Sequence, residues 1–331
     1  MGRQQARRTV QVRRGIGTEL QAQFYSIVEA GIGLARGLHD CPWALPLGKG
    51  TLKMSHVGYR VADPMERPAQ SLTESQRFTR PVTGTVMPIA GGTIEVVPVR
   101  LDAELAAVSE LAQCLSDGER LRAGRFVFER DRRRFIVGRA RLRLCLASRL
   151  GVQPDAVEFD YGPRGKPRLS RIFADTDLRF NISHSEDVAV YAFSNGREIG
   201  VDVEAVREMR DADEIAARFF SRREYEAYLA LDSRDRPLGF FNCWTRKEAF
   251  IKALGEGLHY PLDRFDVSLA PGEPARILRV EDMPGEQCGW TLHSFMPGPG
   301  LAGAVVVRQS SHDMPSVAAS GKTPKCVIAH R

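Results

Sequence analysis

Two short stretches of the chain carry acids and lysines whose spacing suits phosphate chemistry. GVDVE contains Asp202 and Glu204, and TRKEAFIK contains Lys247, Glu248 and Lys252. Two neighbouring carboxylates repel each other unless a proton or a cation lies between them. Three carboxylates with water suit Mg²⁺ rather than zinc, and lysines beside them would compensate a bound phosphate. The pattern therefore indicates a site for magnesium and a phosphate group.

Each stretch also has a purely structural interpretation. Asp202 and Glu204 could form the solvated face of an edge strand. Lys247 and Glu248 could pair with each other inside the core. That pair would leave Lys252, one helical turn after Glu248, without an explanation. The metal and phosphate interpretation therefore accounts for more of the residues.

Other segments add basic and polar side chains. FNISHS has Ser183 and His184 where a strand is expected to end, and the glycine-rich turn GPRGKP carries Arg164 and Lys166. Such turns suit phosphate, although a single histidine or surface lysine is more often structural. Residues 120–143 contain ten arginines and two acids. This basic block indicates either a phosphate-bearing or acidic partner, or a solvated helix face.

Hydrophobic periodicity predicts the elements that position these residues. Strand alternation places Asp202 and Glu204 on one face and apolar residues on the other. This strand and the preceding one are expected to form a hairpin with its tip at Asn195 and Gly196. The stretch 241–258 predicts a helix in which the apolar arc around Trp244 also contains charged residues. Further helices are expected in LDAELAAVSELAQCL, in DRRRFIVGRARLRLCLASRLG up to Gly151, in DADEIAARFF and in EYEAYLAL behind a Ser221–Glu224 capping box, and further strands in TIEVVPVRL, ARILRV, WTLHSF and AGAVVVR.

Composition indicates a globular protein of the cytoplasm. The 331 residues are 43% hydrophobic and 27% charged, with a net charge of +6. The six cysteines form no Cys-x-x-Cys pair, which argues against a zinc site and a disulfide framework. No apolar run is long enough to cross a membrane. We expect a poorly ordered extension or linker over residues 1–92, two halves over 93–199 and 200–309, and a flexible tail over 310–331.

Three motifs together resemble a known family. FNISHS, GVDVE and WTRKEAFIK, in this order and spacing, resemble the signature motifs of the 4′-phosphopantetheinyl transferases, in the longer pseudo-dimeric version first known from surfactin synthesis. GPRGKPRL resembles the accessory motif before them, and FFSRREYEAY the segment between the second and third. The resemblance spans roughly residues 95–308. It implies an α+β fold of two similar α/β halves related by a pseudo-twofold, with the active site in the cleft between them.

The resemblance also implies an activity. Family members move the phosphopantetheine arm of coenzyme A to a serine of an acyl or peptidyl carrier protein and release adenosine 3′,5′-bisphosphate, typically in secondary metabolism such as polyketide or nonribosomal peptide biosynthesis. The metal ligands then correspond to Asp202, Glu204 and Glu248, and the expected coenzyme A contacts are Lys166, Arg164, Ser183, His184, Lys252 and Arg134. Glu248 is expected to take the proton of the carrier serine, Lys247 to stabilise the departing nucleotide and His184 to hold a phosphate.

Two other functions are weighed against the transferase. A metal-dependent nuclease would also use an Asp-x-Glu pair and a lysine, but it leaves FNISHS and the third motif unexplained. A catalytically silent module for coenzyme A or carrier binding would have no need of Glu248. The transferase is expected to act on an acidic carrier protein, to bind no nucleic acid and to be a monomer, because one chain supplies both halves.

Overall fold

A computed structural model describes residues 84–89, 92–162, 165–255, 260–281 and 286–309 of the chain. The expectations for residues 1–83 and 310–331, and for Arg164, lie outside the described residues. The predicted extension is too long at its carboxyl end, because β1 (Thr85–Ile89) pairs with β2 (Gly92–Arg100) in an antiparallel ladder. Across the described ranges, no helix is both long and apolar enough to span a membrane.

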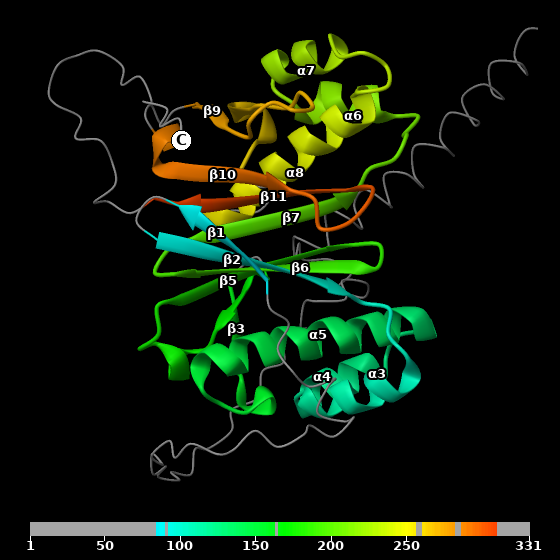
Figure 1. Cartoon of the computed structure of the whole chain (residues 1–331), viewed down its shortest axis with the longest axis vertical. Helices are drawn as coiled ribbons and strands as arrows, with labels where there is room; N and C mark the ends of the chain where they lie inside the picture. The colour runs from blue at the N-terminus through cyan, green and yellow to red at the C-terminus, as the bar shows by residue number, and fades with distance from the viewer. Residues whose placement is uncertain (1–83, 90–91, 163–164, 256–259, 282–285, 310–331) are drawn as a thin grey trace, which may run out of the picture.

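The first sheet is antiparallel, with strand order β1-β2-β6-β5, and its helices form one layer (Figure 1). The remaining strands are β5 (Leu178–Ser185) and β6 (Val188–Asn195). The helices are α3 (Leu105–Leu111), α4 (Asp117–Ala123) and α5 (Glu129–Leu150). α5 ends at Gly151, whose left-handed backbone fits a glycine, as the sequence predicts. A short hairpin, β3 (Phe159–Tyr161) with β4 (Pro167–Leu169), follows it.

The second sheet has three antiparallel strands in the order β10-β11-β7. They are β7 (Ile199–Ala205), β10 (Trp290–Phe295) and β11 (Leu301–Arg308). The helices of this part are α6 (Ala212–Phe219), α7 (Arg222–Leu229) and α8 (Arg236–Leu254), and β8 (Phe265–Val267) pairs with β9 (Ile277–Val280). α8 packs on the sheet through buried aromatic residues such as Phe240, Trp244 and Phe250. The structure is therefore mixed α and β, which confirms the predicted α+β class.

The two sheets pack face to face between the two helical layers (Figure 1). Val190 of the first sheet and Val201, Val203 and Val305 of the second are fully buried in one apolar cluster. The alternation predicted for β7 is thus confirmed, because its apolar face enters this core. Its other face is left for α8.

The predicted hairpin at Asn195 and Gly196 is wrong, although the chain does turn there. Gly196 has a positive φ of 65°, as a tight turn requires. However, β6 pairs with β2 and β5, whereas β7 pairs with β11. Both strands carry an apolar face, and burying these faces against each other puts the strands in different sheets. A local turn signal cannot distinguish the two outcomes.

Candidate active site

A close approach between β7 and α8 creates the site. A Cβ atom added to Gly200 would lie only 2.1 Å from the Ala249 carbonyl oxygen and 2.3 Å from the Ala253 nitrogen. Only glycine therefore lets the helix backbone rest directly on the strand. Because Asp202 lies two residues beyond Gly200 on the same face, its carboxylate meets the side chain of Lys252 from the helix.

Asp202 is the centre of the polar contacts. Its Oδ1 atom accepts hydrogen bonds from Lys252 Nζ at 2.6 Å and from Ser183 Oγ at 2.8 Å. Lys252 also donates to Ser183 at 3.2 Å. The Asp202 residue is only 3% exposed, so these contacts operate with little screening by water. Residues from β5, β7 and α8 thus meet at one carboxylate.

β5 contributes a row of polar side chains that sequence reasoning only partly found. Its edge lies beside β7, and Asn181 Oδ1 accepts from the Val201 backbone nitrogen at 2.9 Å. Ser185 Oγ donates to Glu204 Oε2 at 3.1 Å and accepts from the backbone nitrogen of residue 205. Asn181 and Ser185 flank Ser183 at a spacing of two in FNISHS. Strand periodicity therefore could have identified them.

The carboxylates beside Asp202 hold protons more tightly than free acids. Burial raises the pKa of Glu204 to about 8, with the charge of Asp202 adding to the effect. Burial likewise raises the pKa of Glu248 to about 7; Lys252 opposes this shift and Asp202 adds to it. Burial alone would lower the pKa of Lys252, but Asp202 and Glu248 more than offset that, so its pKa is raised. The cluster therefore has three acidic groups beside one lysine, and two of these acids retain protons near neutral pH in the absence of a further cation.

The oxygen atoms of these residues are suitable ligands for a magnesium ion, but the side chains are not arranged as a preformed coordination site. Asp202 Oδ2 and Glu248 Oε1 are buried oxygens without a hydrogen-bond partner. Buried polar atoms are normally paired, so two such oxygens beside a third carboxylate are suitable hard donors for Mg²⁺. Among the described residues, however, no three His, Cys, Asp or Glu side chains are arranged to hold a metal. A cavity of about 410 Å³ lies at the β3–β4 hairpin, where Tyr161 and Arg168 are among its lining residues.

The other predicted phosphate contacts have protein partners of their own. Burial lowers the pKa of His184, whose charge environment includes Lys252, Asp202 and Arg134, so its imidazole is neutral near pH 7. Arg134 forms a two-pronged ion pair with Asp102, at 2.8 and 2.9 Å. Lys166 Nζ donates to the backbone carbonyl of Lys252 at 2.7 Å. The structure therefore brings His184 and Ser183 to the acids and ties Arg134 and Lys166 to neighbouring segments.

Lys247 lies away from the carboxylate cluster. It is fully buried, with Nζ 2.7 Å from Glu224 Oε2. Nζ also donates to the carbonyls of Leu262 and Phe265, both at 2.6 Å. Glu224 accepts from the Ser221 backbone nitrogen in the capping box predicted for α7. The structural interpretation of an inward lysine thus describes its surroundings, but its acid partner comes from α7 and not from α8.

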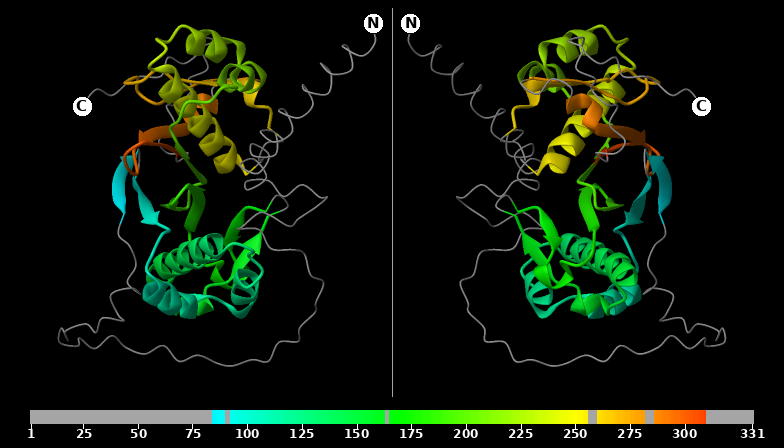
Figure 2. Two further views of the ribbon diagram at one scale, coloured as in Figure 1. Left: turned by 90° about the vertical axis from the view of Figure 1, so that its right-hand side faces the viewer. Right: turned by 90° about the vertical axis from the view of Figure 1, so that its left-hand side faces the viewer.

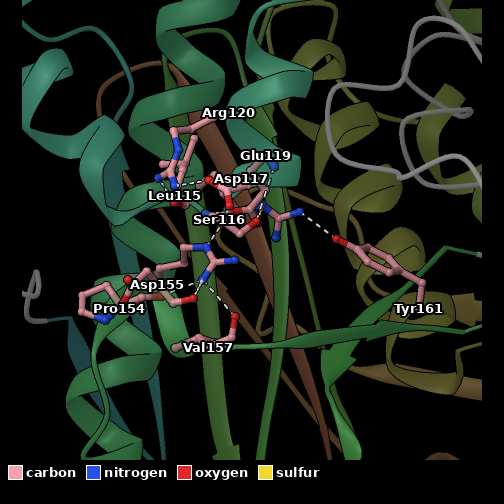
Figure 3. A network of polar contacts seen from close by, with 11 residues as sticks. Leu115, Ser116, Asp117, Glu119, Arg120, Pro154, Asp155, Val157 and Tyr161 are labelled. Carbon is pink, nitrogen blue, oxygen red and sulfur yellow. Dashed lines mark hydrogen bonds and ion pairs between the residues drawn. The ribbon is translucent and has the colours of Figure 1, made fainter. Parts of the chain in front are cut away.

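The arginine-rich block divides between the interior and the surface of the protein, and its buried contacts lie around Glu119 (Figure 3). Arg139 and Arg143 are 1% and 2% exposed and approach the two carboxylate oxygens of Glu119, at 3.0 and 2.6 Å. Arg132 and Arg133 pair with Glu129 on the helix surface. Glu119 lies just before the block, so the charge count over residues 120–143 did not include it. Neither interpretation of the block, a partner surface or a solvated face, describes its buried arginines.

Family models match both sheet regions of the chain. The 4′-phosphopantetheinyl transferase N-terminal model covers residues 102–195, and the 4′-phosphopantetheinyl transferase superfamily model covers residues 198–296. The enzyme HetI of Nostoc sp. is 40% identical over 209 residues, which is 63% of this chain and 85% of that protein. Sfp of Bacillus subtilis is 34% identical over 191 residues, 58% of this chain and 81% of that protein.

A solved Thermotoga maritima holo-[acyl-carrier-protein] synthase aligns with 34% of this chain and 62% of its own, at 23% identity and a TM-score of 0.27, which is too weak to support a conclusion. The sequence relatives are sufficient. The chain belongs to the 4′-phosphopantetheinyl transferase superfamily, which confirms the family expected from the three motifs. Enzymes of this family transfer the phosphopantetheine arm of coenzyme A to a serine of a carrier protein, so the predicted enzyme class is also confirmed.

Proposed function

We propose that the cluster around Asp202 is the centre at which this chain transfers the phosphopantetheine arm to a carrier serine. The observation that supports it most directly is the pair of buried, unpartnered oxygens on Asp202 and Glu248 beside the Lys252 ammonium. Asp202, Glu204 and Glu248 would hold Mg²⁺. When bound, the ion supplies a Lewis acid that neutralises charge on the pyrophosphate of coenzyme A.

The proposed chemistry is an in-line displacement at phosphorus. The serine Oγ of the carrier forms a bond to the phosphorus that bears the pantetheine arm, and the bond from this phosphorus to the bridging oxygen breaks. The serine proton passes to Glu248, directly or through a water molecule. A carboxylate with a pKa of about 7 suits a general base near neutral pH. The electron pair of the broken bond leaves on adenosine 3′,5′-bisphosphate.

Neighbouring side chains would bind and orient the pyrophosphate. Lys252 is protonated and lies beside Asp202, where it can compensate phosphate charge. His184 is neutral and can donate one hydrogen bond to a phosphate oxygen. Ser183 can donate its hydroxyl once Asp202 has another ligand. Arg134 could reach the 3′-phosphate only by exchanging its ion pair with Asp102, and Arg164 remains a contact proposed from its place in the accessory motif.

Lys247 is proposed here as a structural residue and not as an acid for the departing nucleotide. Its three N–H donors are matched by Glu224 and by two backbone carbonyls. For Lys247 to contact a phosphate, its buried ion pair and hydrogen bonds would have to be broken, and breaking a buried ion pair is costly in free energy. Lys247 is thus assigned to stability, whereas its neighbour in the sequence, Glu248, is assigned to metal binding and proton transfer.

We further propose that the chain consists of two similar halves, is a monomer and is located in the cytoplasm. The two sheets, each with its own helical layer, support two halves over residues 93–199 and 200–309 related by a pseudo-twofold. The adjoining family-model matches support the same division and a monomer in which one chain supplies the whole site. The buried free thiols, such as Cys145 and Cys243, support a reducing cytoplasm. We expect an acidic carrier, no role for nucleic acid, and a place in secondary metabolism.

Intact mass spectrometry of an apo carrier protein tests this function. The carrier is incubated with the protein, coenzyme A and Mg²⁺, and a gain of one phosphopantetheine arm is expected. The gain should disappear with EDTA, with a carrier whose acceptor serine is alanine, and with Asp202→Asn. No gain on several carriers, despite measurable coenzyme A binding, would favour a silent binding module. Cleavage of DNA or RNA without transfer would favour the nuclease.

A further inference from the structure

The β3–β4 hairpin is anchored at its base by a buried charge network. Arg139 Nη2 donates to the Tyr161 hydroxyl at 3.0 Å, and its guanidinium lies 4.9 Å from the centre of the Phe159 ring. Arg139 is 1% exposed and forms its ion pair with Glu119. Both aromatic residues belong to β3. Arg139 therefore fixes this strand from the α5 side.

Glu119 and Arg143 extend the same network (Figure 3). The Glu119 side chain accepts from the Ser116 nitrogen as the capping box of α4, so its position is set by the start of a helix. Arg143 donates to the carbonyls of Pro154 and Val157, at 2.7 and 2.9 Å, in the segment that leads into β3. A buried ionic group of this kind is stable only with all its partners in place. The base of the hairpin is thus well defined.

The far end of the hairpin contacts the other sheet region. Lys166 precedes β4, and its Nζ donates to the carbonyls of Lys252 at 2.7 Å and Ile199 at 3.3 Å. The first carbonyl lies in the last turn of α8, where carbonyls have no partner within the helix and a cation is favourable. The second lies at the start of β7. Figure 2 shows the hairpin extending from the first helical layer toward the end of α8.

Lys252 is consequently held at two points. Lys166 binds its carbonyl oxygen, and Asp202 binds its ammonium at 2.6 Å. Two of the three N–H donors of Lys166 are used on carbonyls, and Oε2 of Glu198 lies 3.7 Å from its Nζ. Most of the donor capacity of Lys166 is thus used on protein carbonyls in this arrangement.

We propose that Lys166 is a positioning residue that fixes Lys252, and through it the end of α8, relative to Asp202 on β7. The proposal rests on the proposed function of the Asp202 cluster. It assigns the accessory-motif lysine to alignment of the catalytic helix across the two sheet regions, in place of direct contact with coenzyme A. A misplacement of about 1 Å at a catalytic group can cost about a hundredfold in rate.

The test compares Lys166→Met, Lys252→Met and the double variant in the full chain. The matched control is Arg168→Met, which removes an exposed cation from the same hairpin without touching α8. We expect Lys166→Met to lower kcat by about tenfold to a hundredfold with KM for coenzyme A changed less than about threefold. The two substitutions should be non-additive, because Lys166 acts through Lys252. Lys166→Arg should recover part of kcat, and Arg168→Met should match the unmodified protein.

Several results would overturn the proposal. A large rise in KM for coenzyme A with kcat unchanged would make Lys166 a coenzyme contact. Additive losses in the cycle, or a lower Tm with kcat and KM unchanged, would exclude positioning. If Lys166→Met does not fold, Lys166→Gln, whose uncharged amide retains two N–H donors, enters the same cycle.

A second measurement is independent of turnover. Hydrogen exchange of the last turn of α8, in protein without substrate, should be faster in Lys166→Met and unchanged in Arg168→Met. Unchanged exchange in both would contradict the proposal. If the unmodified protein transfers no arm, the proposed function fails, whereas the exchange result still decides whether Lys166 orders α8.

Discussion

Replacing Lys247 by methionine should cost stability and leave the chemistry of the folded enzyme intact. The lysine is 0% exposed, and its ammonium contacts Glu224 at 2.7 Å and the carbonyls of Leu262 and Phe265 at 2.6 Å. Methionine retains most of the stem volume but leaves a buried carboxylate and two carbonyls without their cation. Breaking a buried ion pair on one side costs about 3–5 kcal/mol.

The size of this loss relative to total stability makes it measurable. The free energy of unfolding of a domain is about 5–15 kcal/mol, so this loss is a large part of it. A loss of about 3–5 kcal/mol lowers the folded-to-unfolded ratio of Lys247→Met by about a hundredfold or more. Burial already raises the pKa of Glu224, and loss of Lys247 would raise this pKa further. Protonation then relieves the unpaired charge. The destabilisation should therefore shrink as the pH falls toward about 5.

Urea unfolding followed by circular dichroism gives the free energy, and intact mass spectrometry gives kcat for the folded fraction. We expect a lower urea midpoint for Lys247→Met, with kcat per folded molecule within about threefold of the unmodified protein. The double variant Lys247→Met/Glu224→Gln should recover part of the loss, because no buried charge remains unpaired. Arg222→Met, which removes an exposed cation from α7, is the control and should change little. An unchanged midpoint with kcat lowered about a hundredfold would refute the structural role and return Lys247 to the chemistry.

Three other perturbations test the site. Gly200→Ala should lower the free energy of unfolding by about 1–3 kcal/mol, measured by thermal melting, and should lower the transfer rate, because a Cβ atom there collides with α8. The control Gly118→Ala, which has open space around it, should not destabilise the protein. Equal effects of the two substitutions would contradict this explanation. The pKa values of Glu204 and Glu248, raised to about 8 and about 7, mean that the folded, metal-free protein binds more protons than the unfolded chain. Its Tm should therefore fall as the pH rises from about 5 to 8, with a smaller slope in Glu204→Gln; a Tm that rises over this window with the same slope in the variant would refute the assignment. Mg²⁺ should raise the Tm more at pH 8 than at pH 6, because more of these acids are ionised at pH 8. Asp202→Asn should abolish the increase in Tm, and an increase that persists in this variant would place the ion elsewhere.

The local patterns in the sequence determined much of the site. Alternation in GVDVE places Asp202 and Glu204 opposite the apolar face, and the structure buries that apolar face between the sheets. The Ser221–Glu224 capping box and the helix end at Gly255 are also present. These features depend on backbone geometry over a few residues, which the chain carries wherever it lies in the fold.

Tertiary structure alone decided which side chains meet. The helical wheel places Lys247 and Glu248 in one arc, but it cannot show that Glu224 of α7 pairs with the lysine. Nor can a charge count show that Glu119 gathers two arginines of α5. Such partners come from segments far apart along the chain, and the gain from pairing buried charges exists only after packing has removed water from them. The same holds for Gly200: only glycine fits at this position because the backbone of α8 packs against it, and that contact exists only in the folded protein.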